Sequence, residues 1–435
     1  MLALAAAALL AAAPDAPLTL DEALAEAAHA NPDLAAARAD VDAAGADVTS
    51  ARGGYLPRLD VGAGFGYFWS STDVGVNTST GFLTAEGATY SAQAQARQPL
   101  FDGFLTSRAV AGARASERAS ARLFDETTLS VSFQVTLSFY ELVKAERTLS
   151  VLEKTAARSE DLVARADALY AAGRAPKSEI FQARVNLGND RIAIEGQRAR
   201  VARARSDLAV ALGRSPANGL SVVAPPNVDT KGVPSGEPPA LAGLVETARG
   251  RRPSVAAQAA LVDAAEAQIG VARADYWPSL AATGSYQRQS DQLGGSGGVY
   301  GDLSRQYSAT AQVVVSWNLF DGRRTAAAVD RASAGALRAR ATAAKASDAV
   351  AREVTDARAS VVALARQIAI AAENLEAATQ GLALARERLD AGLATQLELR
   401  DVSLKLTQAE LSLVQTRIDH AVAVADLNRA TGGAL

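Results

Sequence analysis

Two long stretches of the chain place apolar residues three or four positions apart. They run without a proline from Gly103 to Gly173 and from Gly322 to Gly392. The second stretch carries its apolar residues at Val350, Val354, Ala357, Val361, Leu364, Ile368, Ala371, Leu375, Ala378, Leu382, Ala385 and Leu389. Such spacing is typical of coiled-coil helices, and the many alanines let helices approach closely. We predict two coiled-coil helices, each on the order of 100 Å long.

Shorter helices are predicted on both sides of each long one. The glycine after each long helix is typical of the left-handed residue that follows a helix C-terminus. Return helices are expected from Pro176 to Leu212 and from Thr395 to Thr431. A further helix precedes each hairpin, roughly at 32–56 and 253–277, and lies between two prolines. Because the two shorter helices together match the long one in length, they can stack end to end beside it.

Between these helices the pattern changes to strict alternation in each half. From Leu59 to Trp69 the odd positions are apolar or aromatic, and mostly glycine lies between them. From Tyr307 to Trp317 apolar residues again alternate with polar ones, except at Val314. Alternation of this kind predicts strands with one apolar and one polar face, here of about ten to fourteen residues. We expect β-hairpins at 57–101 and 278–320.

Aromatic residues are concentrated around these hairpins. Residues 55–104 and 276–320 hold 16 of the 22 Phe, Tyr and Trp residues. Aromatic residues at strand ends, an apolar face and a polar face are typical of a transmembrane β-barrel. Expected loops at 73–88 and 291–305 are polar and rich in Gly, Ser and Thr, which favours the same interpretation. A half-buried hairpin pair in a soluble protein remains the alternative.

The whole pattern is written twice, as an internal tandem duplication. Seven blocks recur in the same order about 220 residues apart: Pro32–Ala36 with Pro253–Ala257, Val41–Ala44 with Val262–Ala265, Tyr55–Leu59 with Tyr276–Leu280, Tyr90–Ala92 with Tyr307–Ala309, Leu100–Gly103 with Leu319–Gly322, Ala172–Gly173 with Ala391–Gly392, and Asp207–Leu208 with Asp426–Leu427. The first repeat spans 17–213 and the second 241–432. Between them, 214–240 holds six of the fourteen prolines and is expected to be a linker outside the helices.

The first sixteen residues form a separate segment. They are apolar and end in small residues, which resembles the core of a secretory signal peptide, although no basic residue precedes it. A short N-terminal helix is the alternative. If 1–16 is a signal peptide, possibly truncated, the mature chain is exported, and its lack of cysteine suits an oxidising compartment.

Composition excludes several classes of function. The 44 basic and 47 acidic residues give a net charge of −3, which excludes a strongly basic nucleic-acid binder. Without cysteine there is no disulfide, thiolate metal site or cysteine nucleophile, and only two histidines are present. We find no catalytic motif, so we expect no enzyme activity, no cofactor and no metal site. The sequence contains no apolar run of about 18 residues, so we expect no membrane-spanning helix.

Four strands cannot close a barrel, and lipid does not tolerate open sheet edges. If the strands lie in a membrane, more than one chain must therefore share the barrel. The duplicated plan, with Tyr55–Leu59 and Tyr276–Leu280 before the hairpins, LFDG after them and glycine turns beyond, resembles the TolC-like outer-membrane efflux protein family over roughly 18–432. The resemblance implies a mainly α protein with a membrane β-barrel. It implies a homotrimer with a twelve-strand barrel in the outer membrane and a long coiled-coil helical barrel in the periplasm, with 214–240 in an equatorial region.

The resemblance also suggests working residues and partners. It places the two glycine turns at the periplasmic tip, where an adaptor (membrane fusion) protein binds; these turns contain Gly173, Arg174, Gly392, Leu393, Ala394 and Thr395. The family carries Ser or Thr after the turn, as at Thr395, whereas Pro176 and Lys177 differ. A plain helix C-cap is the alternative role of both glycines. An inner-membrane pump of the RND, ABC or MFS type and outer-membrane lipid are the other implied partners.

The family closes its tunnel near this tip with rings of acidic residues. The matching positions are Glu398 and Asp401, with Glu179 in the first repeat. Glu398 and Asp401 are three residues apart and share one helical face. In a trimer each would form a ring of three carboxylates that selects cations. Ordinary solvated helix charge is the alternative. Leu389 stands where the family has a gate tyrosine.

Two functions compete at this point. The first is a passive outer-membrane exit duct for a tripartite efflux pump or a type I secretion system. The second is a non-transport coiled-coil scaffold, such as a surface stalk, which would not depend on the two hairpins.

Overall fold

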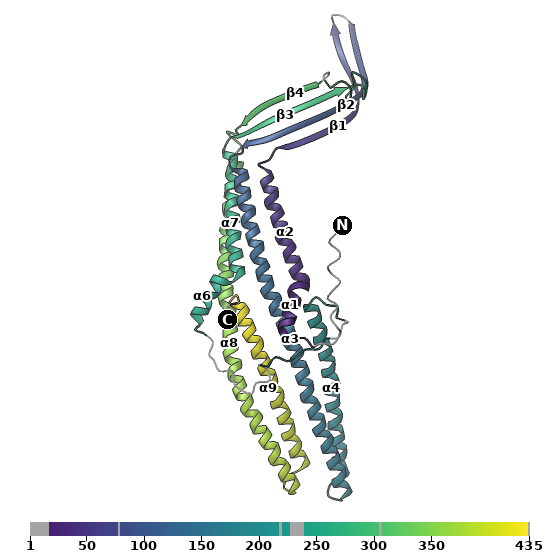
Figure 1. Ribbon diagram of the computed structural model, residues 1–435, viewed down its shortest axis with the longest axis vertical. Helices are drawn as coiled ribbons and strands as arrows, with labels where there is room; N and C mark the ends of the chain where they lie inside the picture. The colour runs from purple at the N-terminus through teal and green to yellow at the C-terminus, as the bar shows by residue number, and fades with distance from the viewer. Residues whose placement is uncertain (1–16, 77–78, 217–219, 227–238, 304–306, 434–435) are drawn as a thin grey trace. The chain divides into compact units, whose positions relative to one another are not determined.

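The computed structural model describes residues 17–76, 79–216, 220–226, 239–303 and 307–433 (Figure 1). The expected signal segment 1–16 lies outside them. The chain divides into two compact units. A helical unit comprises Met1–Asp40, Ala121–Ala257 and Ala344–Leu435, and a sheet unit comprises Val41–Ser120 and Gln258–Ala343. The described chain is mostly helical with one four-stranded antiparallel sheet, which confirms that much of the expected fold class.

The long helices match the pattern closely. Helix α3 spans Leu105–Ala171 and α8 spans Arg324–Asp390, with 67 residues each. The return helices α4, Lys177–Ala211, and α9, Gln396–Ala430, have 35 residues each. In both repeats a glycine at positive φ separates the long helix from the return helix. Glycine adopts this backbone conformation without a Cβ clash, so it ends the helix at a defined residue.

The helix ahead of each hairpin is preceded by a short helix that the pattern did not predict. Helix α1, Leu20–Ala30, stands before α2, Pro32–Gly53, and α6, Leu241–Arg251, stands before α7, Pro253–Arg273. The breaks fall at Asn31 and Arg252, both extended and both followed by proline. A proline disfavours the helical conformation of the residue before it, which explains each break. A short 3-10 helix η1, Ala274–Tyr276, follows α7.

The helical unit has two main apolar clusters. The larger one joins α1, α3, α4 and α9, and its fully buried side chains include Val135, Phe139, Leu142, Leu208, Leu212 and Ile418. The second joins α6, α8 and α9 around Leu244, Val354 and Leu427. Each long helix therefore packs against its own return helix and against the short helix of its repeat. No helix among the described residues is long and apolar enough to cross a membrane.

The described part of the linker packs on the first repeat. Leu18 forms a parallel β-bridge with Val222, through Leu18 N–H to Ser221 O at 2.9 Å and Val223 N–H to Leu18 O at 3.0 Å. Leu220 is buried in the larger apolar cluster. Residues 220–226 of the linker thus lie beside the start of α1.

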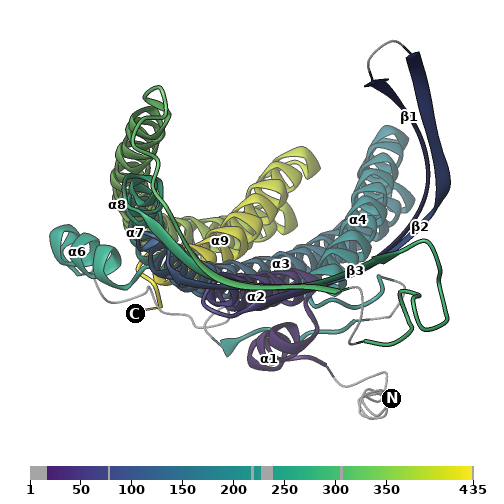
Figure 2. The same ribbon diagram turned by 90° about the horizontal axis from the view of Figure 1, so that it is seen from above.

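The sheet has the strand order β1-β2-β3-β4, which is also the order in the sequence. Strands β1, Arg58–Val76, and β2, Ser79–Phe101, form the first hairpin, and β3, Ser279–Ser290, and β4, Tyr307–Ser316, form the second. Strand β2 pairs with β3 and joins the two repeats, and Figure 2 shows the strands as one curved sheet. In the part of the chain described, β1 and β4 are the two edges of this sheet.

The first hairpin is longer than expected. Strands β1 and β2 have 19 and 23 residues, and pairing continues to Val76 opposite Ser79, so most of the expected loop 73–88 is strand. Thr and Val positions in this polar stretch favour extended backbone, although its composition is that of a loop. Strands β3 and β4, with 12 and 10 residues, have about the expected length.

Candidate functional site

The two tip turns end α3 and α8 in the same way, and Figure 1 shows where they connect to α4 and α9. Gly173 has a φ of 71° and Gly392 has a φ of 76°. Arg174 N–H donates to Leu169 O at 2.8 Å and Leu393 N–H donates to Arg388 O at 2.7 Å. These bonds span six residues and define a Schellman motif, so each turn is held by its own backbone. The glycines are therefore helix C-caps, whatever binds the turns.

The return helices begin differently after these turns. Thr395 caps α9, because its side chain accepts a hydrogen bond from Glu398 N–H at 3.2 Å. Pro176 precedes α4 without a side-chain cap. Around the turns Tyr170, Phe181, Leu393 and Leu397 are exposed. Exposed apolar side chains thus flank both turns.

Of the three expected gate carboxylates, Glu179 and Glu398 lie in the first turns of α4 and α9, and Asp401 lies one turn farther along α9. Glu398 lies 3.2 Å from Arg388, and Asp401 lies 2.6 Å from Lys405. Glu179, on α4, instead lines a cavity of about 140 Å³ between α3, α4 and α9, together with Arg400 and Ser159. Arg388 and Lys405 were not anticipated as partners of these acids. Helical spacing of four residues from Asp401 to Lys405 was the available signal.

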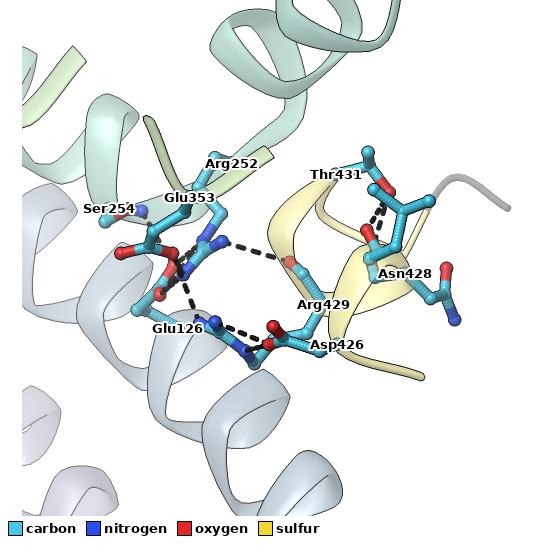
Figure 3. Close-up of polar contacts among 9 residues, drawn as sticks. Glu126, Arg252, Ser254, Glu353, Asp426, Asn428, Arg429 and Thr431 are labelled. Carbon is cyan, nitrogen blue, oxygen red and sulfur yellow. Dashed lines mark hydrogen bonds and ion pairs between the residues drawn. The ribbon is translucent and has the colours of Figure 1, made fainter. Parts of the chain in front are cut away.

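A second group of charged residues lies in the helical unit and was not expected from the sequence (Figure 3). Arg252, only 3% exposed, lies 2.7 Å from Glu126 of α3 and 3.3 Å from Glu353 of α8. It also donates to Arg429 O of α9 at 3.1 Å. Glu126 further accepts a hydrogen bond from Ser254 N–H at 3.1 Å. One guanidinium at the break between α6 and α7 thereby connects both long helices, α3 and α8, and the return helix α9.

The protonation of this group follows from its surroundings. Burial raises the pKa of Glu126, but the hydrogen bond and the positive charge of Arg252 lower it more, so the net pKa lies below the ordinary value. Arg429 extends the group: it lies 3.4 Å from Glu353 and 2.8 Å from Asp426, and it stacks over the Phe133 ring at 5.2 Å. The first repeat has Asn31 in place of Arg252, and its amide donates to Ala211 O at 2.9 Å.

The LFDG segments make the turns between strand and long helix. Asp102 accepts a hydrogen bond from Thr106 N–H at 2.8 Å, and Asp321 accepts one from Thr325 N–H at 2.7 Å. In each turn the glycine and the following residue have positive φ, between 66° and 68°. An acidic side chain that caps the first turn of a helix satisfies otherwise unpaired amides. The motif is therefore a capped turn that starts each long helix.

The two LFDG glycines differ in what surrounds them. A Cβ at Gly103 would overlap the carbonyl oxygen of Ala274 and lie 2.9 Å from the Trp277 Cβ. The short helix η1, which follows α7 in the second repeat, therefore packs directly on Gly103. A Cβ at Gly322 would meet nothing within 4 Å. The backbone at Gly103 is thus covered by a neighbouring segment, whereas the equivalent backbone at Gly322 is left uncovered by the described residues.

The sheet keeps its two faces separate across all four strands. Opposed pairs such as Val61 with Ala94, and Leu280 with Val315, lie on one face. Aromatic pairs stand on the same face: Phe65 with Tyr90, with ring centroids 5.1 Å apart, and Tyr286 with Tyr307, 5.7 Å apart. The opposite face holds a hollow of about 270 Å³, lined mainly by polar residues that include Gln95, Arg97, Thr283, Ser285, Thr310 and Gln312.

Known proteins share this architecture. The fold is similar to that of CusC, whose crystal structures describe folding and transmembrane channel formation, with a TM-score of 0.81 and 21% identity over 95% of this chain and 92% of that one. It is also similar to the Campylobacter jejuni CmeC outer membrane channel, with a TM-score of 0.80 and 17% identity over 95% and 85% of the chains. These structures are of channels and not of enzymes.

Sequence similarity points the same way. Protein CyaE of Bordetella pertussis is 30% identical over 227 residues, which cover 51% of this chain and 45% of that protein. The match thus spans somewhat less than half the length of that relative. The outer membrane efflux protein family matches residues 23–214 and again 244–433, one match for each repeat. The chain therefore belongs to the outer membrane efflux protein family.

Proposed function

We propose that this protein is a passive exit duct across the outer membrane and the periplasm, serving a tripartite efflux pump or a type I secretion system. Three chains would contribute four strands each to a twelve-strand barrel in the outer membrane, and their helices would enclose a tunnel in the periplasm. The single observation that carries the proposal is the sheet. Its apolar face is exposed, including Leu59, Val61, Val313 and Val315, while its opposite face is polar.

Membrane placement accounts for this exposed face. Strands β3 and β4, with 12 and 10 residues, have about the length that a tilted transmembrane strand needs. Near the helices the exposed aromatic residues Tyr55, Tyr276 and Trp277 form one band, and Phe65, Tyr67 and Tyr307 form another farther along the strands. Two aromatic bands with an apolar zone between them are the pattern of an outer-membrane barrel. A scaffold protein would leave the apolar face without a partner, so that alternative is not favoured.

The duplication supports a closed ring. Strands β2 and β3 join the two repeats inside one chain, and β1 and β4 leave equivalent edges at the ends of the sheet. Pairing of β4 with β1 of a second copy would repeat the β2–β3 junction. Gly322 would then receive the second copy's counterpart of the contact that Ala274 and Trp277 make with Gly103. Such a head-to-tail interface would close into a ring if its rotation fits, and we propose three copies because the resemblance to the family implies a trimer.

The tip would carry the contacts with the pump. We place the adaptor at the turns with Gly173, Arg174 and Gly392, Leu393, Ala394, Thr395, because exposed apolar side chains surround them. Threefold symmetry would turn Glu398, Asp401 and Glu179 into rings of carboxylates that favour cations and narrow the tunnel. The pairing of Glu398 with Arg388 and of Asp401 with Lys405 would set how much negative charge each ring presents.

The decisive experiment is a measurement of assembly and conductance. Purified in detergent, the protein should be a trimer by light scattering and should conduct ions in planar lipid bilayers. A variant with residues 58–101 and 279–316 replaced by short linkers should lose both membrane insertion and conductance. A water-soluble monomer, or normal localisation of the variant without hairpins, would contradict the duct and favour the scaffold.

A further inference from the structure

A buried arginine lies on the apolar face of the sheet. Arg288 is opposite Ala92 on one side and Tyr307 on the other, and it is two residues from Tyr286, whose ring is on the same face. Strand positions two apart share a face, so the Arg288 side chain leaves the sheet among apolar neighbours. It is nevertheless only 2% exposed. A cation in this position needs hydrogen-bond acceptors that replace water.

The loop after β3 supplies these acceptors. The Arg288 guanidinium donates to Gly298 O and Asp302 O at 2.9 Å and to Gly301 O at 3.5 Å. Tyr286 OH donates to Leu303 O at 3.1 Å. Both side chains reach the loop from the apolar face, so the loop 291–303 folds back over that face. It lies where β3 ends and before β4 begins.

The loop has a compact fold of its own. Val299 N–H donates to Gln292 O at 3.0 Å, Tyr300 N–H donates to Leu293 O at 3.2 Å, and the Val299 side chain is buried. A Cβ at Gly298 or Gly301 would overlap the backbone of Gly294 or Gly295. Only glycine allows these two segments of the loop backbone to approach so closely. The loop 291–303 is thus a compact structure held by its own backbone hydrogen bonds.

The loop 291–303 exposes three large apolar side chains. Leu293, Tyr300 and Leu303 are 51%, 67% and 69% exposed, although most of the loop is Gly, Ser and Asp. Tyrosine at the rim of an apolar band favours the boundary between lipid headgroups and acyl chains, and a leucine beside it can enter the acyl chains. The carbonyl acceptors of Arg288 suit the same place, because they pair both of its terminal NH groups without water, although its buried Nε has no hydrogen-bond partner among the described residues.

We propose that the loop 291–303 is an anchor for the lipid surface, docked on the apolar face by Arg288, with Tyr300 and Leu303 at the boundary between headgroups and acyl chains. This inference rests on the proposed function, because it requires the apolar face to contact lipid. It adds that an outer loop, and not only the strands, binds the membrane and limits how deep the sheet can sit.

The lack of cysteine makes the test direct. Single variants Tyr300→Cys, Leu303→Cys, Ser296→Cys, Val61→Cys and Gln93→Cys would each carry one nitroxide label on the full chain in phospholipid vesicles. Collision with oxygen reports lipid, and collision with a water-soluble nickel chelate reports water. The ratio of oxygen to nickel accessibility should be severalfold higher at 300 and 303 than at 296, a matched position on the same loop. Val61 should report lipid, and Gln93, on the polar face, should report water.

Each outcome decides a different point. Lipid contact at Val61 with water contact at 300 and 303 overturns the anchor and leaves the duct standing. Water contact at Val61 overturns the membrane placement itself, and the anchor falls with it. Labels at 300 and 303 that reach neither reagent indicate a second copy on the loop, which also overturns the anchor.

Arg288 is tested separately in the same assay. Arg288→Ala should release the loop, so that the ratio at 300 falls to that at 296 while the ratio at Val61 stays unchanged. The Val61 label shows that the variant still folds and inserts. An unchanged ratio at 300 in this variant would overturn the docking role of Arg288.

Discussion

The guanidinium of Arg252 lies 2.7 Å from the carboxylate of Glu126, at the point where α6 and α7 break apart. Their elements are far apart in the sequence, so the pair fastens the second repeat to the long helix of the first. Arg252→Ala removes one partner and leaves a half-buried carboxylate, which should cost about 3–5 kcal/mol of unfolding free energy. Chemical denaturation in detergent measures this loss.

A matched control is the exposed pair of Arg118 with Asp263, at 3.1 Å. Arg118→Ala should cost less than about 1 kcal/mol, because water screens an exposed pair. The double variant Arg252→Met with Glu126→Leu should recover part of the loss, since no charge is then left buried. Equal losses for Arg252→Ala and Arg118→Ala would show that burial does not strengthen the first pair.

Acid should weaken the same contact. The pKa of Glu126 is lower in the folded chain than its ordinary value of 4.5. A carboxyl group with a lowered folded pKa stabilises the protein fully above its unfolded pKa, and this stability is lost as the pH falls through the folded pKa. The wild type should therefore lose stability below about pH 4.5 more steeply than Glu126→Gln, which cannot titrate. Denaturation midpoints across this pH range measure the difference, and parallel pH profiles would contradict it.

The proposed gate predicts that substitutions at Asp401 and at Lys405 change cation selectivity in opposite directions. Asp401 and Lys405 form an ion pair at 2.6 Å on an exposed face of α9. Asp401→Ala removes three negative charges from a trimeric ring and should raise conductance and weaken cation selectivity. Lys405→Ala should strengthen cation selectivity, because it leaves the carboxylates uncompensated. Reversal potentials across a salt gradient test both, and no change in either variant would reject the gate.

The open glycine of the second LFDG turn tests the ring. A Cβ at Gly322 meets nothing within 4 Å among the described residues, so Gly322→Ala should cost only about 1–2 kcal/mol for a side chain at a φ of 67°, as expected for Gly392→Ala. If a second copy packs on Gly322 as Ala274 packs on Gly103, Gly322→Ala should also reduce the fraction of trimer. Light scattering compares the two variants. Equal trimer fractions would contradict the proposed interface.

Cross-linking tests the strand pairing across chains. Ala94 of β2 is opposite Tyr286 of β3, and their counterparts in the other repeat are Ala311 and Phe65. The double variant Phe65→Cys with Ala311→Cys should therefore form disulfides between copies and give covalent trimers on a non-reducing gel. In the control Gly64→Cys with Ala311→Cys the two cysteines point to opposite faces and should not react.

Glycine and proline made the helical plan readable from sequence. The expected ends at Gly173 and Gly392 lie two residues beyond α3 and α8, because a left-handed glycine can follow a helix but rarely continues it. Helices α1 and α6 were not predicted because they are only 11 residues long, too short for a clear helical period. The first hairpin was predicted, but its strands were expected to be shorter, because residues 73–88 resemble a loop in composition.

The charged contacts were beyond the reach of a single sequence. Nothing in the pattern separates the buried Arg252 and Arg288 from the many arginines on helix and strand surfaces. Their burial depends on partners brought together by the fold, Glu126 for one and the loop carbonyls for the other. The tip turns could be located from sequence, whereas the role of Glu398 and Asp401 depends on copies that the sequence does not contain.

The two hairpins of the chain have unequal height. Strands β1 and β2 have 19 and 23 residues, whereas β3 and β4 have 12 and 10. In any ring built from copies of this chain, tall and low hairpins must alternate along the outer rim. Each chain would leave one gap in that rim, over its shorter hairpin and between two longer ones. In the proposed duct, large molecules arriving from outside would meet the longer hairpins first, and these would be the parts most accessible to other cells, viruses or antibodies.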